Sequence, residues 1–230
     1  MALDRQVKTM NHELSESEID RRLAQLRGDA DTHQREGGAH RSTAWVLCIA
    51  SAIAFIAAMA LMMSEKAKLE NPSSSLVCDV NPLIGCGKWV GTWQNEVVFG
   101  ISNSLLGVAF FAALLALSLS LLTGSKLHRA MWIALSGAML LGAVWVIWFM
   151  YQSLVVAHSI CPFCMIVWLC MIPLSITIWG RSAQAGHLGT SCETAGRFIV
   201  RNRFVIAAIA YAALITLLVV WFWADWQLLF

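Results

Sequence analysis

The sequence predicts an all-α membrane protein with five transmembrane helices. Of its 230 residues, 58% are apolar and only 13% are charged, whereas an average soluble domain carries about 25% charged residues. Five stretches lack Asp, Glu, Lys and Arg, and each is about long enough to cross a bilayer as a helix. They are residues 44–63, 101–122, 130–152, 162–179 and 204–223. This composition excludes an ordinary soluble enzyme, and a net charge of +2 gives no indication of nucleic-acid binding.

The chain begins with a polar tail of mixed charge, residues 1–43. Ser15 and Glu18 have the spacing of a capping box, which predicts a short amphipathic helix over residues 16–27. We interpret the tail mainly as a solvated segment that supplies positive charge on the cytoplasmic side. A docking helix is the alternative.

The first span is expected to remain as an anchor, because it follows 43 polar residues and no small-residue cleavage pattern comes after it. Thirteen of the sixteen Lys and Arg residues lie in segments 1–43, 123–129 and 180–203, which fall on one side of the membrane. Positive charge gathers on the cytoplasmic side of membrane proteins. We therefore expect a multi-pass protein of the inner or plasma membrane, with a cytoplasmic N-terminus and an external loop over residues 64–100.

Four of the seven cysteines are external in this topology, and they form two close pairs. Cys78 and Cys86 lie in a part of the loop that contains Pro and Gly. A loop dithiol can exchange with a partner protein and with a second dithiol through mixed disulfides. The alternative is a simple structural disulfide. The other cysteines are expected to be buried or reduced; they are Cys48, Cys170 and Cys192.

The second external pair, Cys161 and Cys164, forms a C-x-x-C motif that opens the fourth span. Residues i and i+3 of a helix are neighbours, so the two sulfurs can react with each other. Pro162 suits the first position of a helix. The free N–H groups of a helix N-terminus stabilise a thiolate, most strongly at the first Cys. The motif favours redox chemistry, with a static disulfide or a zinc site that includes the loop cysteines as alternatives.

Two external dithiols need an electron acceptor. The sequence has no haem, Rossmann or iron–sulfur motif, so a membrane quinone is the remaining candidate. Its pocket is expected near Cys164, where polar groups of residues 102–104 could donate a hydrogen bond to a quinone carbonyl.

The chain resembles the vitamin K epoxide reductase family, in the bacterial branch that makes protein disulfides. The resemblance covers about residues 44–180 and rests on the order and spacing of three motifs. These are Cys78-Asp79-Val80 with Cys86, Asn103-Ser104-Leu105-Leu106-Gly107, and Cys161-Pro162-Phe163-Cys164.

The resemblance implies a four-helix transmembrane bundle around a quinone, either menaquinone or ubiquinone, in residues 44–180. A cytoplasmic loop, 181–203, and a segment with a fifth transmembrane helix, 204–230, follow it. Because no thioredoxin-like domain follows the fifth span, a separate thioredoxin-like (DsbA-like) oxidase is expected as the partner.

The resemblance also implies roles for single residues. Cys78 and Cys86 would accept electrons from the partner, Cys86 would form a transient bridge to Cys161, and Cys164 would lie beside the quinone. Asn103 matches the family's asparagine that bonds the quinone oxygen, and Trp168 stands where animal members carry a tyrosine. Trp89, Trp93 and Val97 have the i, i+4, i+8 spacing of one helix face, which resembles the family's short lid helix.

The expected function is that of a quinone-dependent thiol oxidoreductase that reoxidises the partner and so supports disulfide formation in exported proteins. Electrons would pass from Cys78 and Cys86 to Cys161 and Cys164, and then to quinone. One alternative is a reductase of vitamin K epoxide. Another is a membrane protein without enzymatic activity, whose external disulfides are structural.

Overall fold

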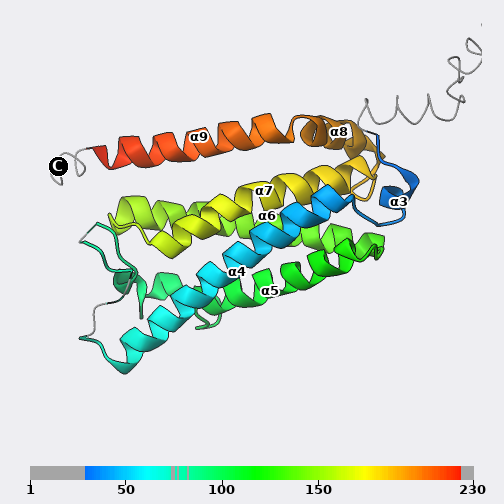
Figure 1. Cartoon of the computed structure of the whole chain (residues 1–230). Helices are drawn as coiled ribbons and strands as arrows, with labels where there is room; N and C mark the ends of the chain where they lie inside the picture. Colours follow the sequence, from blue (N-terminus) through cyan, green and yellow to red (C-terminus); the bar gives the residue numbers. More distant parts are fainter. Residues whose placement is uncertain (1–28, 74–75, 77, 82, 224–230) are drawn as a thin grey trace, which may run out of the picture.

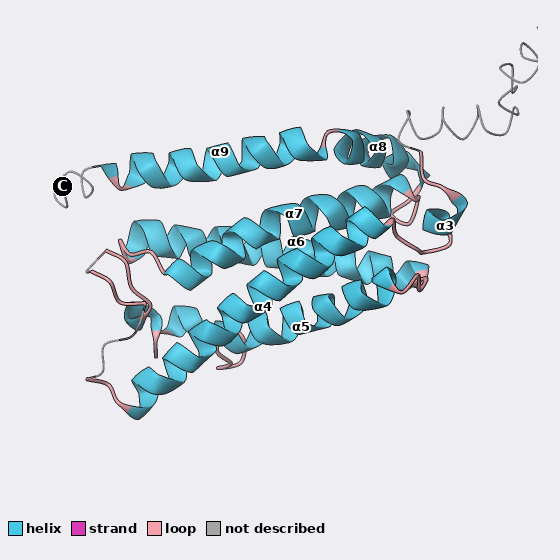
Figure 2. Ribbon diagram, viewed as in Figure 1, coloured by secondary structure: helices cyan, strands magenta, loops and turns pink. Residues whose placement is uncertain are grey.

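Five long helices dominate the computed structural model of the chain, which describes residues 29–73, 76, 78–81 and 83–223. They are α4 (Arg41–Glu70), α5 (Asn103–Leu122), α6 (Arg129–Tyr151), α7 (Pro162–Gln184) and α9 (Arg203–Trp221). Each is long and apolar enough to cross a membrane. Figure 2 shows helices joined by loops, and the described residues contain isolated bridges but no strand. The predicted all-α, multi-pass membrane protein is confirmed.

Four of the long helices form a bundle, and the fifth lies outside it (Figure 1). Helix α4 packs against α5 and α7, and α6 packs against α7. Helix α9 also contacts α7. The buried face of α4 is made of small side chains, which allow helices to approach closely in a membrane. They include Ala44, Ala50, Ser51, Ala54 and Ala58. No residue of α9 is buried in the protein, so this helix offers most of its surface to lipid.

The two ends of the bundle differ in composition. At one end lie α3 (Thr32–Arg35), the α5–α6 turn and α8 (Glu193–Arg201); at the other lies the connection between α4 and α5 (Figure 1). Most of the described Lys and Arg residues are therefore at the end that carries α3 and α8. We call the opposite end, formed by residues 71–102 and 157–161, the loop end.

Residues 29–40 pack against the bundle, which differs from the expected solvated tail. Gln34 and Ala39 are buried. The guanidinium group of Arg181 donates to the carbonyl of Gly38 and lies 3.8 Å from the centre of the Trp132 ring. The helix predicted over residues 16–27 lies outside the described residues.

Helix α4 runs past the first charged residues and ends at Glu70, seven residues beyond the predicted end of the span at residue 63. The α4–α5 connection then holds two 3-10 turns, η1 (Gly87–Trp89) and η2 (Trp93–Asn95), in place of one lid helix. The expected single face is therefore wrong: Trp89 is 5% exposed, whereas Trp93 is 66% exposed. Extended residues and the positive φ of Gly91, 72°, interrupt the helical path between the two turns.

Candidate active site

The four cysteines of the two sequence motifs lie together at the loop end. Cys78 and Cys86 form a disulfide bond, with their Cα atoms 5.7 Å apart. Cys161 and Cys164 are free thiols, and Cys161 Sγ lies 3.2 Å from Cys86 Sγ. Thiol–disulfide exchange requires a thiolate to reach a disulfide sulfur. Cys86 is therefore positioned for attack by Cys161.

Backbone hydrogen bonds place the loop disulfide beside Cys161. The amide of Gly85 donates to the carbonyl of Ile160 at 3.0 Å, and the amide of Ile160 donates to the carbonyl of Leu83 at 2.8 Å. These two bonds form a short parallel bridge one residue before Cys161. The two motifs, 75 residues apart in sequence, are thus held in register by the main chain rather than by side chains alone.

Asp79 holds the loop around Cys86. Its Oδ1 atom accepts hydrogen bonds from the amides of Cys86, at 2.8 Å, and Gly87, at 2.9 Å. Burial disfavours the charged carboxylate, but these backbone donors and that of Leu76 outweigh it, and the pKa of Asp79 is lowered. A Cβ atom at Gly85 or Gly87 would lie 2.8 Å from the carboxylate, so this close approach requires glycine on both sides of Cys86.

Cys161 and Cys164 take up the geometry predicted for the start of a helix. Cys161 is the N-cap of α7, and Pro162 occupies the first turn. A hydrogen bond from Cys164 lowers the pKa of the Cys161 thiol, burial opposes this effect, and the amides of Cys164 and Phe163 add to the lowering. The net result is a more stable thiolate at Cys161, the sulfur that faces the loop disulfide.

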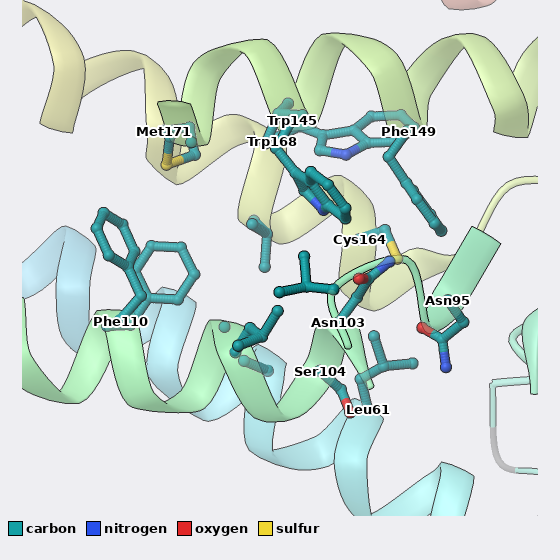
Figure 3. Close-up of a pocket in the computed structure, with 18 of the residues that line it drawn as sticks. Leu61, Asn95, Asn103, Ser104, Phe110, Trp145, Phe149, Cys164, Trp168 and Met171 are labelled. Carbon is teal, nitrogen blue, oxygen red and sulfur yellow. The ribbon is translucent and has the colours of Figure 1, made fainter. Parts of the chain in front are cut away.

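A cavity of about 420 Å³ lies between α4, α5, α6 and α7 at the loop end (Figure 3). This volume is typical of a site for a small organic ligand. Its wall is mainly apolar and includes Trp89, Phe110, Phe111, Trp145, Phe149 and Trp168. Cys86 and Cys164 also line it. One wall residue, Leu141 of α6, is 73% exposed on the outer surface of the bundle, so the cavity reaches the lipid-facing side.

The sequence-predicted ligand residues Asn103 and Trp168 line the same cavity as Cys164 (Figure 3). Asn103 is the first residue of α5, and its Nδ2 atom donates to the carbonyl of Gln94 at 2.9 Å. Its Oδ1 atom is buried and has no hydrogen-bond partner. A buried polar atom without a partner is costly. The cavity thus offers an unused acceptor, and a second hydrogen on Nδ2, close to the thiol.

Sequence reasoning missed two polar residues of the cavity, Asn95 and Glu65. Glu65 lies in the last turns of α4, is 7% exposed, and accepts hydrogen bonds from the side chains of Asn95, Ser102 and Ser104. The residue follows the predicted end of the first span by two positions, where charge indicated a loop. Its spacing from Ala58 and Leu61, which also line the cavity, could have placed it on the same helix face.

The remaining cysteines lie away from this cluster. Cys170 is in the core of the bundle, Cys48 is half-buried on α4, and Cys192 is at the opposite end, in η4 (Thr190–Cys192). They are free thiols, and none of them lines the cavity.

Comparison with known proteins adds a family assignment. The model of the vitamin K epoxide reductase family matches residues 45–179, which is more than half of the chain and includes all four clustered cysteines. No curated protein matches the chain.

Proposed function

Because the chain belongs to the vitamin K epoxide reductase family, we propose that it is a quinone-dependent thiol oxidoreductase that reoxidises a thioredoxin-like partner. Members of the family are membrane redox enzymes associated with quinones and thiol partners. The observation that carries the proposal is a continuous series of sulfurs. The Cys78–Cys86 disulfide touches Cys161 at 3.2 Å, and Cys164 lines an apolar cavity.

The first half of the proposed reaction is thiol–disulfide exchange. A thiolate of the partner attacks Cys78, the partner's second thiol closes the partner disulfide, and Cys78 and Cys86 are left reduced. In the next exchange, Cys86 attacks a Cys161–Cys164 disulfide at Cys161, which is the sulfur that it contacts. Cys78 then displaces Cys161, so the loop disulfide is restored and Cys161 and Cys164 become thiols. Each exchange transfers two electrons and two protons from a dithiol to a disulfide.

The residues of the cavity fit a quinone. Aromatic side chains can enclose a flat ring, and a lipid-soluble ligand can enter through the side where Leu141 faces the bilayer. The second Nδ2 hydrogen of Asn103 would donate to a quinone oxygen, and its unpartnered Oδ1 atom would accept from a quinol hydroxyl. Trp168 would pack beside the ring. A quinone bound there supplies the capacity to take up two electrons and two protons. Cys164 is the thiol from which those electrons would leave.

We also propose the location and domain division expected from the sequence. The catalytic bundle is residues 44–180, preceded by a cytoplasmic tail and followed by a cytoplasmic loop and the fifth helix. The loop end, with its four cysteines, would face the extracytoplasmic side of the inner or plasma membrane. The partner would be a separate DsbA-like oxidase that serves exported proteins.

The test is quinone reduction by the purified protein in detergent, driven by either a small dithiol or a reduced thioredoxin-like protein. Cys164→Ala is expected to abolish the reaction with both donors. Cys86→Ala is expected to abolish it only with the protein donor, because a small dithiol can reach the second pair directly. Cys192→Ala, at the opposite end of the bundle, is the control and should retain full activity.

Three outcomes would contradict the proposal. Absence of quinone turnover by the wild-type protein, together with loop cysteines that resist dithiols, would favour structural disulfides. An unaffected Cys164→Ala variant would remove the role of that thiol. Turnover of vitamin K epoxide in place of quinone would favour the epoxide reductase.

A further inference from the structure

Glu65 is a buried acid that the proposed sulfur relay does not use. Its carboxylate is held by one amide and two hydroxyl groups, from Asn95, Ser102 and Ser104, and all three of these donors are neutral. Hydroxyl groups can rotate to donate or to accept, so the two serines can bond either a carboxylate oxygen or the hydroxyl of a carboxylic acid.

Glu65 also lies between two spaces. It lines the cavity that contains Cys164, and it also lines a groove of about 360 Å³ formed by the last turns of α4 and the start of α5. The groove contains Lys66 and Glu70, whose side chains are 76% and 68% exposed and lie 3.7 Å apart. Glu65 is therefore shared by the buried cavity and by a groove that reaches solvent.

The two serines extend the connection on each side of Glu65. Ser104 lines the cavity and Ser102 lines the groove. Their hydroxyl oxygens are 2.7 Å apart, and both hydroxyls bond the same carboxylate oxygen, Oε2. The hydrogen bonds thus run without interruption from the cavity to the groove.

We propose that Glu65, Ser104 and Ser102 form a proton path between the cavity beside Cys164 and the outer groove; this inference rests on the proposed function. Closure of the Cys161–Cys164 disulfide releases two electrons and two thiol protons. Both electrons and two protons end on a quinone, whose two carbonyl oxygens become hydroxyls. One thiol proton passes to the quinone and the other leaves to water. The Glu65 carboxyl group gives the second proton to the cavity and regains one from the groove through Ser102, so protons and charge balance.

Few other titratable groups surround this path. In the groove they are Lys66 and Glu70, on the same helix as Glu65. In the cavity the titratable group is the thiol of Cys164 from α7, because Cys86 is held in a disulfide bond. Helix α5 contributes only the serines and Asn103. Among the residues lining the cavity, Glu65 is the one carboxylic acid.

The experiment compares wild type with Glu65→Gln, Glu65→Asp and Glu96→Gln, using dithiothreitol and a short-chain quinone. Glu65→Gln keeps the size and an acceptor oxygen but cannot exchange a proton, so we expect quinone reduction about 10²-fold slower, the lower range for loss of an acid–base group. Glu65→Asp should recover most of the rate. Glu96 is an exposed acid in the α4–α5 connection, and Glu96→Gln should match wild type.

A second measurement needs no turnover. Infrared difference spectra of the quinone-free protein, recorded between acidic and neutral pH, should contain the carbonyl band of a buried carboxylic acid. The band should be absent in Glu65→Gln and present in Glu96→Gln. Quenching of Trp fluorescence should show that Glu65→Gln still binds quinone.

The outcomes separate the proton path from the proposed function. A Glu65→Gln protein that reduces quinone at the wild-type rate, or a wild-type spectrum without the band, would overturn the path and leave the sulfur relay standing. Wild type without quinone turnover would instead overturn the function. If Glu65→Gln does not fold, Ser102→Ala is expected to slow the reaction while Ser102→Thr, which keeps the hydroxyl, does not; equal rates for the two would overturn the path.

Discussion

A single carboxylate, that of Asp79, fixes the position of the reactive sulfur Cys86. Hydrogen bonds to charged groups contribute about 1.5–3 kcal/mol each when well shielded. Asp79 is only half-buried, so solvent reduces this contribution. The carboxylate nevertheless accepts hydrogen bonds from the amides of Cys86 and of the next residue, Gly87.

Asp79→Asn is predicted to loosen the loop by about 1 kcal/mol, since an amide keeps only one acceptor oxygen. Limited proteolysis of the purified protein should cut the α4–α5 connection faster in the variant. Glu96→Gln removes the same charge from an exposed position of the same connection, and it should behave as wild type. Equal cleavage of all three proteins would mean that Asp79 does not hold the loop.

At the opposite end, His187 is a buried imidazole beside two cations. Burial and the guanidinium groups of Arg181 and Arg129 lower the pKa of His187 to about 4. An unfolded histidine has a pKa of about 6.5. Below that value the unfolded chain binds a proton that the folded protein refuses until about pH 4, so stability is complete above pH 6.5 and falls as pH decreases between the two values.

The thermal midpoint of the protein in detergent is therefore predicted to fall by a few degrees between pH 7 and pH 5. His187→Gln should reduce this fall, because the variant has no group there to titrate. His40→Gln replaces an exposed imidazole and serves as the control. A His187→Gln protein with the pH dependence of wild type would show that other groups cause the loss.

At the scale of elements, the parallel bridge between residues 83–85 and Ile160 joins the loop disulfide to the start of α7. Ile160→Pro removes the amide that donates to Leu83, at a cost of about 1 kcal/mol for the lost bond. We predict about fivefold slower electron transfer from the loop pair to Cys161 and Cys164, because a cost of 1.4 kcal/mol would be a factor of ten.

Rapid mixing with a reduced protein donor, followed by alkylation of free thiols, measures that transfer. Ile160→Ala keeps the amide and should remain close to wild type. Reaction with a small dithiol, which bypasses the loop pair, should be little changed in both variants. A proline variant with a normal transfer rate would show that the bridge does not set the geometry of the two sulfurs.

Most elements could be predicted from the sequence because each apolar run is unbroken and long. The ends of the helices could not, because hydrogen bonding of the backbone continues beyond the first charge: α4 includes Glu65, Lys66 and Lys68. The prediction of a single lid helix was wrong because the i, i+4, i+8 spacing of apolar residues assumes a continuous helix. The backbone leaves the helical path at Gly91, which has a positive φ.

The pair Cys161 and Cys164 could be predicted because its pattern is local in sequence. Two cysteines three residues apart at the start of a helix are enough to define a reactive pair. The environment of Glu65 could not be predicted. Its partners Asn95, Ser102 and Ser104 are 30 to 39 residues away in sequence, and only the folded bundle brings them to one carboxylate. Polar networks made of distant segments have no local pattern.

At the scale of the whole molecule, the two ends of the bundle have separate roles. The proposed cysteine chemistry is at the loop end, and most of the described basic residues are at the other end. By the positive-inside rule, we predict that a membrane-impermeant maleimide added to intact cells labels Glu96→Cys but not Ser191→Cys, both of which replace exposed residues. Disruption of the membrane should expose Ser191→Cys to the reagent, and the reverse labelling pattern would invert the proposed topology.

The open side of the cavity at Leu141 determines whether the concentration of the ligand should be expressed for the membrane or for the water. A ligand that enters there arrives by lateral diffusion in the bilayer, so the relevant concentration is its mole fraction among lipids rather than its amount per litre of water. Adding detergent or lipid at constant total quinone should then dilute the ligand in its own two-dimensional solvent and lower the rate. Kinetic constants from micelles and from membranes become comparable only after this surface dilution is taken into account.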